Sequence, residues 1–219
     1  MANKSLGVTK FFYGFLSHLN SERKRIAPLQ ISGRLEDYLV HEFISYIHSS
    51  SNSARFAFTN IGNASEQKVD IIIASGTREK ISITAMIEAK YLRNRHRFSN
   101  NSAEDEIKTI LRSLQKQLHQ FSENVHAGYP VQLLSKRQDI YGIVFSSYVD
   151  VFGKEEEINI GKERFYSRCL SAASDLGLRY HDLRKPYWRS AFENERVNAL
   201  KTSWSISLRA GLWRLESRE

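Results

Sequence analysis

A glutamate and a lysine two residues apart, Glu88 and Lys90, lie at the end of the alternating apolar segment 81–90. In a β-strand, residues two apart project to the same face, so these two side chains lie together while Ala89 faces the other side. The acid-x-Lys triplet also occurs elsewhere in the chain, as at Glu66 and Glu106, and about one or two chance occurrences are expected. Only the triplet at Glu88 ends a long apolar strand, which sets it apart.

A second acid, Asp70, interrupts the apolar segment 68–74. An ionised carboxylate is costly to bury unless a cation or several hydrogen-bond donors compensate for the lost water. The short turn 75–80 allows the segments before and after it to lie side by side, which would bring Asp70 close to Glu88 and Lys90. Two carboxylates and a lysine gathered in this way could hold a divalent cation, because Mg²⁺ prefers hard oxygen ligands.

The elements that must position these residues follow from the hydrophobic periodicity. The expected order is a helix at 34–47, strands at 55–60, 68–74 and 81–90, a helix at 104–121 and a strand at 139–149. The sequence therefore predicts an α/β fold with a mixed central β-sheet flanked by helices.

Further elements are expected on both sides of this set. The N-terminal FFYGFL predicts an amphipathic first helix, a helix is expected at 163–176, and a strand or strand pair at 204–215. We find no repeat and no linker, so the prediction is one domain over 1–219. Its core would span about 34–150, and 151–219 would form a C-terminal extension.

The order of elements and the motif residues resemble the PD-(D/E)XK nuclease superfamily, whose core is restriction-endonuclease-like. The family places an acid on its second strand and an acid-x-Lys motif on its third. Val69-Asp70 and Glu88-Ala89-Lys90 match this pattern, with Val69 in place of the proline. The resemblance covers about 34–149.

The resemblance implies a Mg²⁺-dependent nuclease in which Mn²⁺ can substitute for Mg²⁺. Asp70, Glu88 and the backbone carbonyl of Ala89 would hold the metal ion, and Lys90 would position or deprotonate the attacking water. Glu36 resembles the first-helix glutamate that holds metal through water or orients the lysine. Gln117, four residues before a phenylalanine, is similar to the Gln-x-x-x-Tyr motif of one branch and would have a supporting role.

Each of these residues also has a purely structural interpretation. Glu88 and Lys90 could form an ion pair on an exposed strand, which contributes less than about 1 kcal/mol. Asp70 could cap a bend in the chain, and Glu36 could be a solvated helix residue. The sequence alone leaves both interpretations open.

An excess of positive charge points to nucleic acid as the partner. Lys and Arg outnumber Asp and Glu by 32 to 24, which gives a formal charge of +8. Arg93, Arg95 and Arg97 follow the Glu88 strand and could neutralise phosphates, or they could form a solvated basic loop. The basic and aromatic segment 184–189 could stack on nucleic acid or pack normally.

DNA is the expected partner and RNA remains open. The expected function is a DNA endonuclease of restriction or anti-phage type, for which a homodimer would supply two sites. Two alternatives remain: an inactive nuclease-fold module that binds nucleic acid, and a basic interaction subunit.

Composition excludes several other classes. No apolar run reaches the roughly 18 residues that cross a bilayer, so no membrane role is expected. The single cysteine, Cys169, cannot form an intramolecular disulfide, and it predicts a reduced core thiol in a cytoplasmic protein. The histidines show no metal-binding spacing, so none is assigned a catalytic role.

Overall fold

The computed structural model describes residues 7–32, 35–50, 55–58, 61–62, 68–77, 80–93, 139–151 and 188–215. The predicted helices at 104–121 and 163–176 lie outside the described residues, as does Cys169. Within the described ranges, no helix is long and apolar enough to cross a membrane.

Three helices form the N-terminal part of the described chain: α1 (Val8–Ser21), α2 (Arg23–Ser32) and α3 (Glu36–Ser50). In α1 and α3 the buried side chains recur at steps of three and four residues, as in Phe12, Phe15 and Leu19, so each helix buries one face. The predicted amphipathic first helix and the predicted helix at 34–47 are confirmed. Helix α2 was not predicted, because it is basic at its start and contains Pro28.

A mixed six-stranded sheet lies beside the helices, in the order β1-β4-β5-β6-β8-β7. Its strands are β1 (Arg55–Phe58), β4 (Ile71–Thr77), β5 (Lys80–Arg93), β6 (Asp139–Val151), β7 (Trp188–Ala199) and β8 (Thr202–Leu215). Strands β5 and β6 are parallel, and the other neighbours are antiparallel. Two short strands, β2 (Ile61–Gly62) and β3 (Lys68–Val69), pair separately. The predicted α/β class with a mixed central sheet is confirmed.

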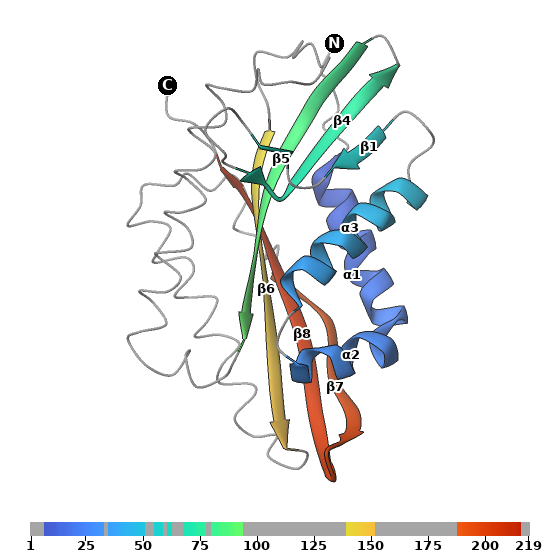
Figure 1. The fold of residues 1–219 in the computed structure, drawn as a ribbon, viewed down its shortest axis with the longest axis vertical. Helices are drawn as coiled ribbons and strands as arrows, with labels where there is room; N and C mark the ends of the chain where they lie inside the picture. Colours follow the sequence, from blue (N-terminus) through green and yellow to red (C-terminus); the bar gives the residue numbers. More distant parts are fainter. Residues whose placement is uncertain are drawn as a thin grey trace.

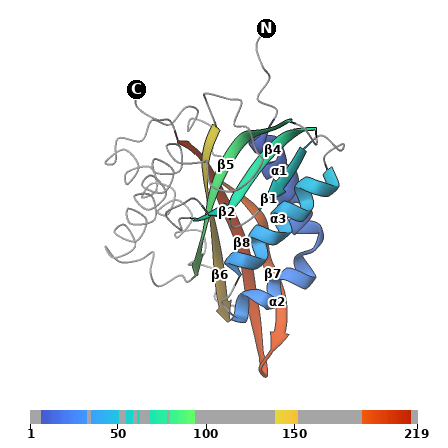
Figure 2. The same ribbon diagram turned by 45° about the horizontal axis from the view of Figure 1, so that its top comes forward.

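The main hydrophobic core lies between the helices and one face of the sheet, as Figures 1 and 2 show. Its centre is Phe15 of α1, whose ring lies 4.7 Å from that of Phe43 of α3 and 6.3 Å from that of Phe145 of β6. Strand β5 contributes Ala85, Ile87 and Ala89 to this core. Because side chains alternate along a strand, Met86, Glu88 and Lys90 project to the opposite face.

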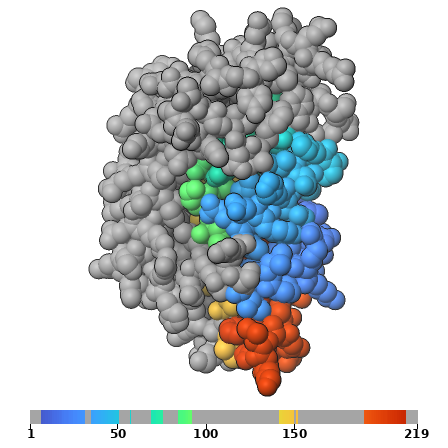
Figure 3. All heavy atoms as spheres, viewed as in Figure 1, coloured from blue at the N-terminus to red at the C-terminus, as the bar shows by residue number. Residues whose placement is uncertain are grey.

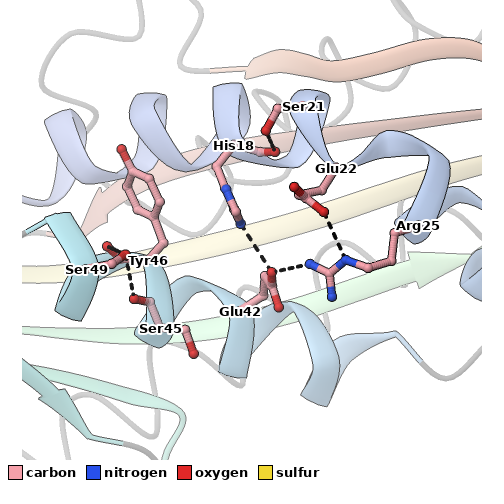
Figure 4. Close-up of polar contacts among 8 residues, drawn as sticks. All are labelled: His18, Ser21, Glu22, Arg25, Glu42, Ser45, Tyr46 and Ser49. Carbon is pink, nitrogen blue, oxygen red and sulfur yellow. Dashed lines mark hydrogen bonds and ion pairs between the residues drawn. The ribbon is translucent and has the colours of Figure 1, made fainter.

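A partly buried carboxylate joins the helices to each other (Figure 4). Oε1 of Glu42 on α3 lies 2.6 Å from Nη2 of Arg25 on α2 and 3.2 Å from Nε2 of His18 on α1. Arg25 also donates to Glu22, at the junction of α1 and α2. Burial raises the pKa of Glu42, but the hydrogen bonds from His18 and Arg25 outweigh burial and lower it overall. The network therefore joins the three helices around one ionised group.

The C-terminal strands extend the same sheet. The strand predicted at 204–215 is confirmed as β8, which pairs with β6 over twelve residue pairs from Ile140↔Leu215 to Val151↔Trp204. Strand β7 was not predicted. Its register against β8 shifts twice, between Ser190 and Phe192 and between Phe192 and Glu195, so a period of two is not visible in its sequence. Both strands belong to the central sheet.

Candidate active site

Asp70 lies where strand β4 departs from strand β5. The ladder between these strands ends at the pair Ile71↔Ile87, and the chain bends at Asp70. Oδ2 of Asp70 accepts a hydrogen bond of 2.8 Å from the backbone N–H of Ala89. The carboxylate thus replaces the backbone partner that β5 loses when β4 turns away.

Glu36 covers the next exposed N–H group along the same edge of β5. It is the first residue of α3, and its Oε2 accepts a hydrogen bond of 2.9 Å from the N–H of Tyr91. The N–H and C=O groups of residues two apart point to the same edge of a strand, so Ala89 and Tyr91 face the gap left by β4. The backbone carbonyl of Ala89 faces this gap too, beside the carboxylate of Asp70.

Lys90 lies between acids from two different elements. Its Nζ is 3.0 Å from Oε1 of Glu88 and 3.6 Å from Oε1 of Glu36. The Lys90 side chain is 27% exposed and that of Glu88 is 3% exposed, so the lysine lies between a buried acid and solvent. Figure 3 shows atoms of β5 (green) reaching this face of the molecule beside α3 (light blue).

Glu88 has an unusual electrostatic environment. Burial raises the pKa of its carboxyl group first, and the charge of the neighbouring Asp70 raises it further. The ammonium group of Lys90 lowers it, and the balance is a pKa of about 7. Two carboxylates that repel each other in a buried position are expected where a cation binds, because the cation removes the repulsion.

The pKa of Lys90 is raised, not depressed. Burial alone would lower it, but the charges of Glu88, Asp70 and Glu36 outweigh burial. A base would require a depressed pKa, so this environment holds Lys90 as an ammonium group. The arrangement favours Lys90 as a donor that orients an oxygen atom over Lys90 as a proton acceptor.

The donor set fits Mg²⁺ in its chemistry. Asp70 and Glu88 are adjacent carboxylates, and the carbonyl of Ala89 supplies a third oxygen at the same edge. Within the described parts of the chain, no group of three or more His, Cys, Asp or Glu side chains could hold a metal ion. Glu36 therefore does not join Asp70 and Glu88 as a third side-chain ligand, and its contacts are with Tyr91 and Lys90.

The same geometry partly agrees with the purely structural interpretations of these residues. Asp70 does cap a bend, through Ala89, and Glu88 does pair with Lys90. The pair is not an exposed surface contact, however, because Glu88 is 2% exposed. Glu36 is partly exposed but is fixed by two contacts. The sequence did not reveal that the N–H groups of Ala89 and Tyr91 are the hydrogen-bond partners of Asp70 and Glu36. The one available signal was Asp70 itself, because aspartate is depleted in strands and this one lies within an apolar run.

Several predicted residues cannot be placed in this site. Arg93 is the last residue of β5, and Arg95, Arg97 and Gln117 lie outside the described residues. In the basic and aromatic segment 184–189, the guanidinium of Arg189 lies 4.6 Å from the centroid of the Tyr13 ring on α1. That arginine packs against a helix.

We compared the chain with protein families, with curated proteins and with solved structures, and none of the three comparisons gave a match. The functional argument therefore rests on the site itself.

Proposed function

We propose that this protein is a Mg²⁺-dependent nuclease of the PD-(D/E)XK type that hydrolyses DNA phosphodiester bonds in the cytoplasm. The observation that carries the proposal is the gap between β4 and β5. There Asp70, Glu88 and the Ala89 carbonyl would supply oxygen ligands, while Nζ of Lys90 lies 3.0 Å from Oε1 of Glu88. The restriction-endonuclease-like core is part of the same proposal, since the described strands β1, β4, β5 and β6 follow the family's order.

Each residue has a distinct part in the proposed reaction. Asp70 and Glu88 would hold Mg²⁺, which supplies charge stabilisation for the phosphate and lowers the pKa of a bound water. Lys90 would donate a hydrogen bond to the attacking water or to a phosphate oxygen. Glu36 would orient Lys90 and hold the edge of β5 through Tyr91. Mn²⁺ could replace Mg²⁺ because it accepts the same hard oxygen ligands.

One experiment with a set of substrates tests the proposal. Purified protein is incubated with supercoiled plasmid, linear duplex, single-stranded DNA and RNA, with Mg²⁺, with Mn²⁺ or with EDTA. We expect DNA cleavage with either metal and none in EDTA. The Asp70→Asn variant should lose both cleavage and Mg²⁺ affinity, whereas Lys10→Ala, which changes an exposed residue of α1, should retain both.

Two results would reject the proposal. Undiminished cleavage in EDTA would exclude the metal site. Metal-independent DNA binding without cleavage of any substrate would instead favour the inactive nucleic-acid-binding module.

A further inference from the structure

Arg209 of β8 is a buried charge whose hydrogen-bonding groups are mostly unsatisfied. The residue is 1% exposed, and only Nη2 has an acid partner among the described residues, Oε1 of Glu193 at 3.2 Å. Nε and Nη1 lack a hydrogen-bond partner in the described part of the chain. A buried guanidinium with three unpaired N–H groups is costly, so an oxyanion that could accept those hydrogen bonds would be bound favourably.

The groups around Arg209 are polar as well. Ser146 lies directly opposite Arg209 on β6, and its hydroxyl is buried without a partner among the described residues. The hydroxyl of Ser205, on the same face of β8, is likewise buried without a partner among the described residues. The guanidinium lies over the Tyr148 ring, 5.0 Å from its centroid, a cation–π contact that stabilises the charge. Hydroxyl and guanidinium donors together suit a phosphate group.

Glu193 is the acid that pairs with Arg209. The side chain of Glu193 is 40% exposed, whereas that of Arg209 is 1% exposed. Glu193 lies on β7, the last strand of the sheet, within the second of the two register shifts. A bulged edge strand loses some of its backbone hydrogen bonds to the neighbouring strand, so this carboxylate can move more easily than one in a regular strand.

Arg209 faces the same side of the sheet as Lys90. Lys90 pairs with Val144, Ser146 follows two residues later on the same face, and Arg209 pairs with Ser146. Two strand spacings and two residue rises separate the Cα atoms of Lys90 and Arg209 by roughly 12 Å. One nucleic-acid strand, which rises about 3.4 Å per phosphate, could reach both residues.

We propose that Arg209 binds a backbone phosphate of the nucleic acid, about three phosphates from the one beside Lys90, and that Glu193 occupies this position in the free protein. The inference rests on the proposed nuclease function and extends it to a second substrate contact. The phosphate would displace the Glu193 carboxylate and accept the unpaired N–H groups of Arg209. Glu193 would then act as a competitor that weakens binding of DNA.

The test measures affinity for a short DNA duplex by fluorescence anisotropy in Ca²⁺, over a range of salt concentrations, and cleavage in Mg²⁺. Glu193→Gln should tighten binding about threefold to tenfold, because the competing charge is removed. The matched control is Glu195→Gln, which removes the same charge two residues later on β7, where the acid pairs with Arg23. Arg209→Gln should weaken binding and reduce the slope of log affinity against log salt by about one.

The outcomes separate this inference from the nuclease proposal. Equal affinity gains for the Glu193 and Glu195 variants, or no gain for either, would overturn the Arg209 site even if Arg209→Gln fails to fold. An unchanged salt slope in a folded Arg209→Gln protein would overturn it too. Wild-type protein that never cleaves but binds DNA with the expected effects of both variants would support the phosphate contact and refute the nuclease activity.

Discussion

Lys90 is held by carboxylates from a strand and from a helix, and this geometry separates a catalytic role from a structural one. We predict that Lys90→Ala lowers Mg²⁺-dependent cleavage on the order of a hundredfold or more while DNA affinity changes little. In the proposed mechanism the ammonium group orients the reacting oxygen, whereas the variant keeps the proposed metal ligands. Cleavage rates and anisotropy in Ca²⁺ measure the two effects, with Lys10→Ala as the charge-matched control. A fully active Lys90→Ala protein would remove the lysine from the mechanism.

The buried carboxyl of Glu88 predicts a pH dependence of stability. Its pKa is about 7 in the folded protein, against 4.5 as its ordinary value. The folded state therefore binds more protons than the unfolded state between these values, and stability falls as pH rises from about 4.5 to 7. The loss is at most about 3 kcal/mol.

Chemical unfolding in EDTA at several pH values measures this effect. Glu88→Gln should flatten the decline and be the more stable protein at pH 8. Asp37→Asn, which changes an exposed acid on α3, should keep the wild-type profile. Mg²⁺ should restore stability to the wild type above pH 7 but not to Glu88→Gln, since the variant lacks one metal ligand. A wild-type profile without any decline between pH 5 and 8 would contradict the assigned environment.

At the scale of elements, the contact of α1 with α3 depends on Gly14. A Cβ atom at this position would collide with the ring and hydroxyl of Tyr46, which lies across the helix interface. Alanine favours helices over glycine by about 1 kcal/mol, but overpacking typically costs 1–3 kcal/mol, so we predict that Gly14→Ala destabilises the protein by about 1 kcal/mol.

Urea unfolding checks the size and origin of this effect. Replacing Tyr46 with leucine in the Gly14→Ala background should recover part of the loss, because the colliding ring is removed. Gly7→Ala is the spatial control, since nothing lies within 4 Å of a Cβ atom there. That variant should show only the small cost of alanine at a helix N-cap. A stabilised Gly14→Ala protein would show that Tyr46 moves aside freely.

At the scale of the whole molecule, DNA affinity and its salt dependence distinguish a nucleic-acid-binding protein from a basic interaction subunit. The excess of 32 basic over 24 acidic residues predicts that DNA affinity falls at least tenfold between 50 and 200 mM salt, because each phosphate contact releases a counterion. Anisotropy with duplex DNA at a series of salt concentrations measures the slope. No measurable affinity at 50 mM salt would favour the interaction subunit.

Much of this architecture could be predicted because the relevant elements bury one regular face. Helix α3 and strand β5 show clean periods, and the pairing of Ile71 with Ile87 follows from a short turn. Strand β7 lacks such a pattern, because its two register shifts change which residues face the core. Arg209 was missed because a charged residue in a strand is expected to be exposed to solvent, whereas this residue is only 1% exposed.

The proximity of Asp70 and Glu88 could be predicted, but the point at which β4 separates from β5 could not. Where two strands separate depends on the bend at Asp70 and on the position of α3, neither of which a local pattern specifies. The pKa of Lys90 is raised first by Glu88 and Asp70, and also by Glu36, which is distant in sequence and meets the lysine only in three dimensions.

The position of β8 between β6 and β7 also has a consequence for how the chain folds. This strand follows every other described strand in the sequence, yet it joins β7 to the rest of the sheet. Helices α1 and α2, which are translated before the strands, pack against β7 and β8. The contact order is therefore high, and folding should be slow, because distant segments must meet before their contacts compensate for the loop entropy. Until residues beyond about 202 have been translated, the apolar face of α1 lacks its partners on β8 and is open to chaperones and to aggregation.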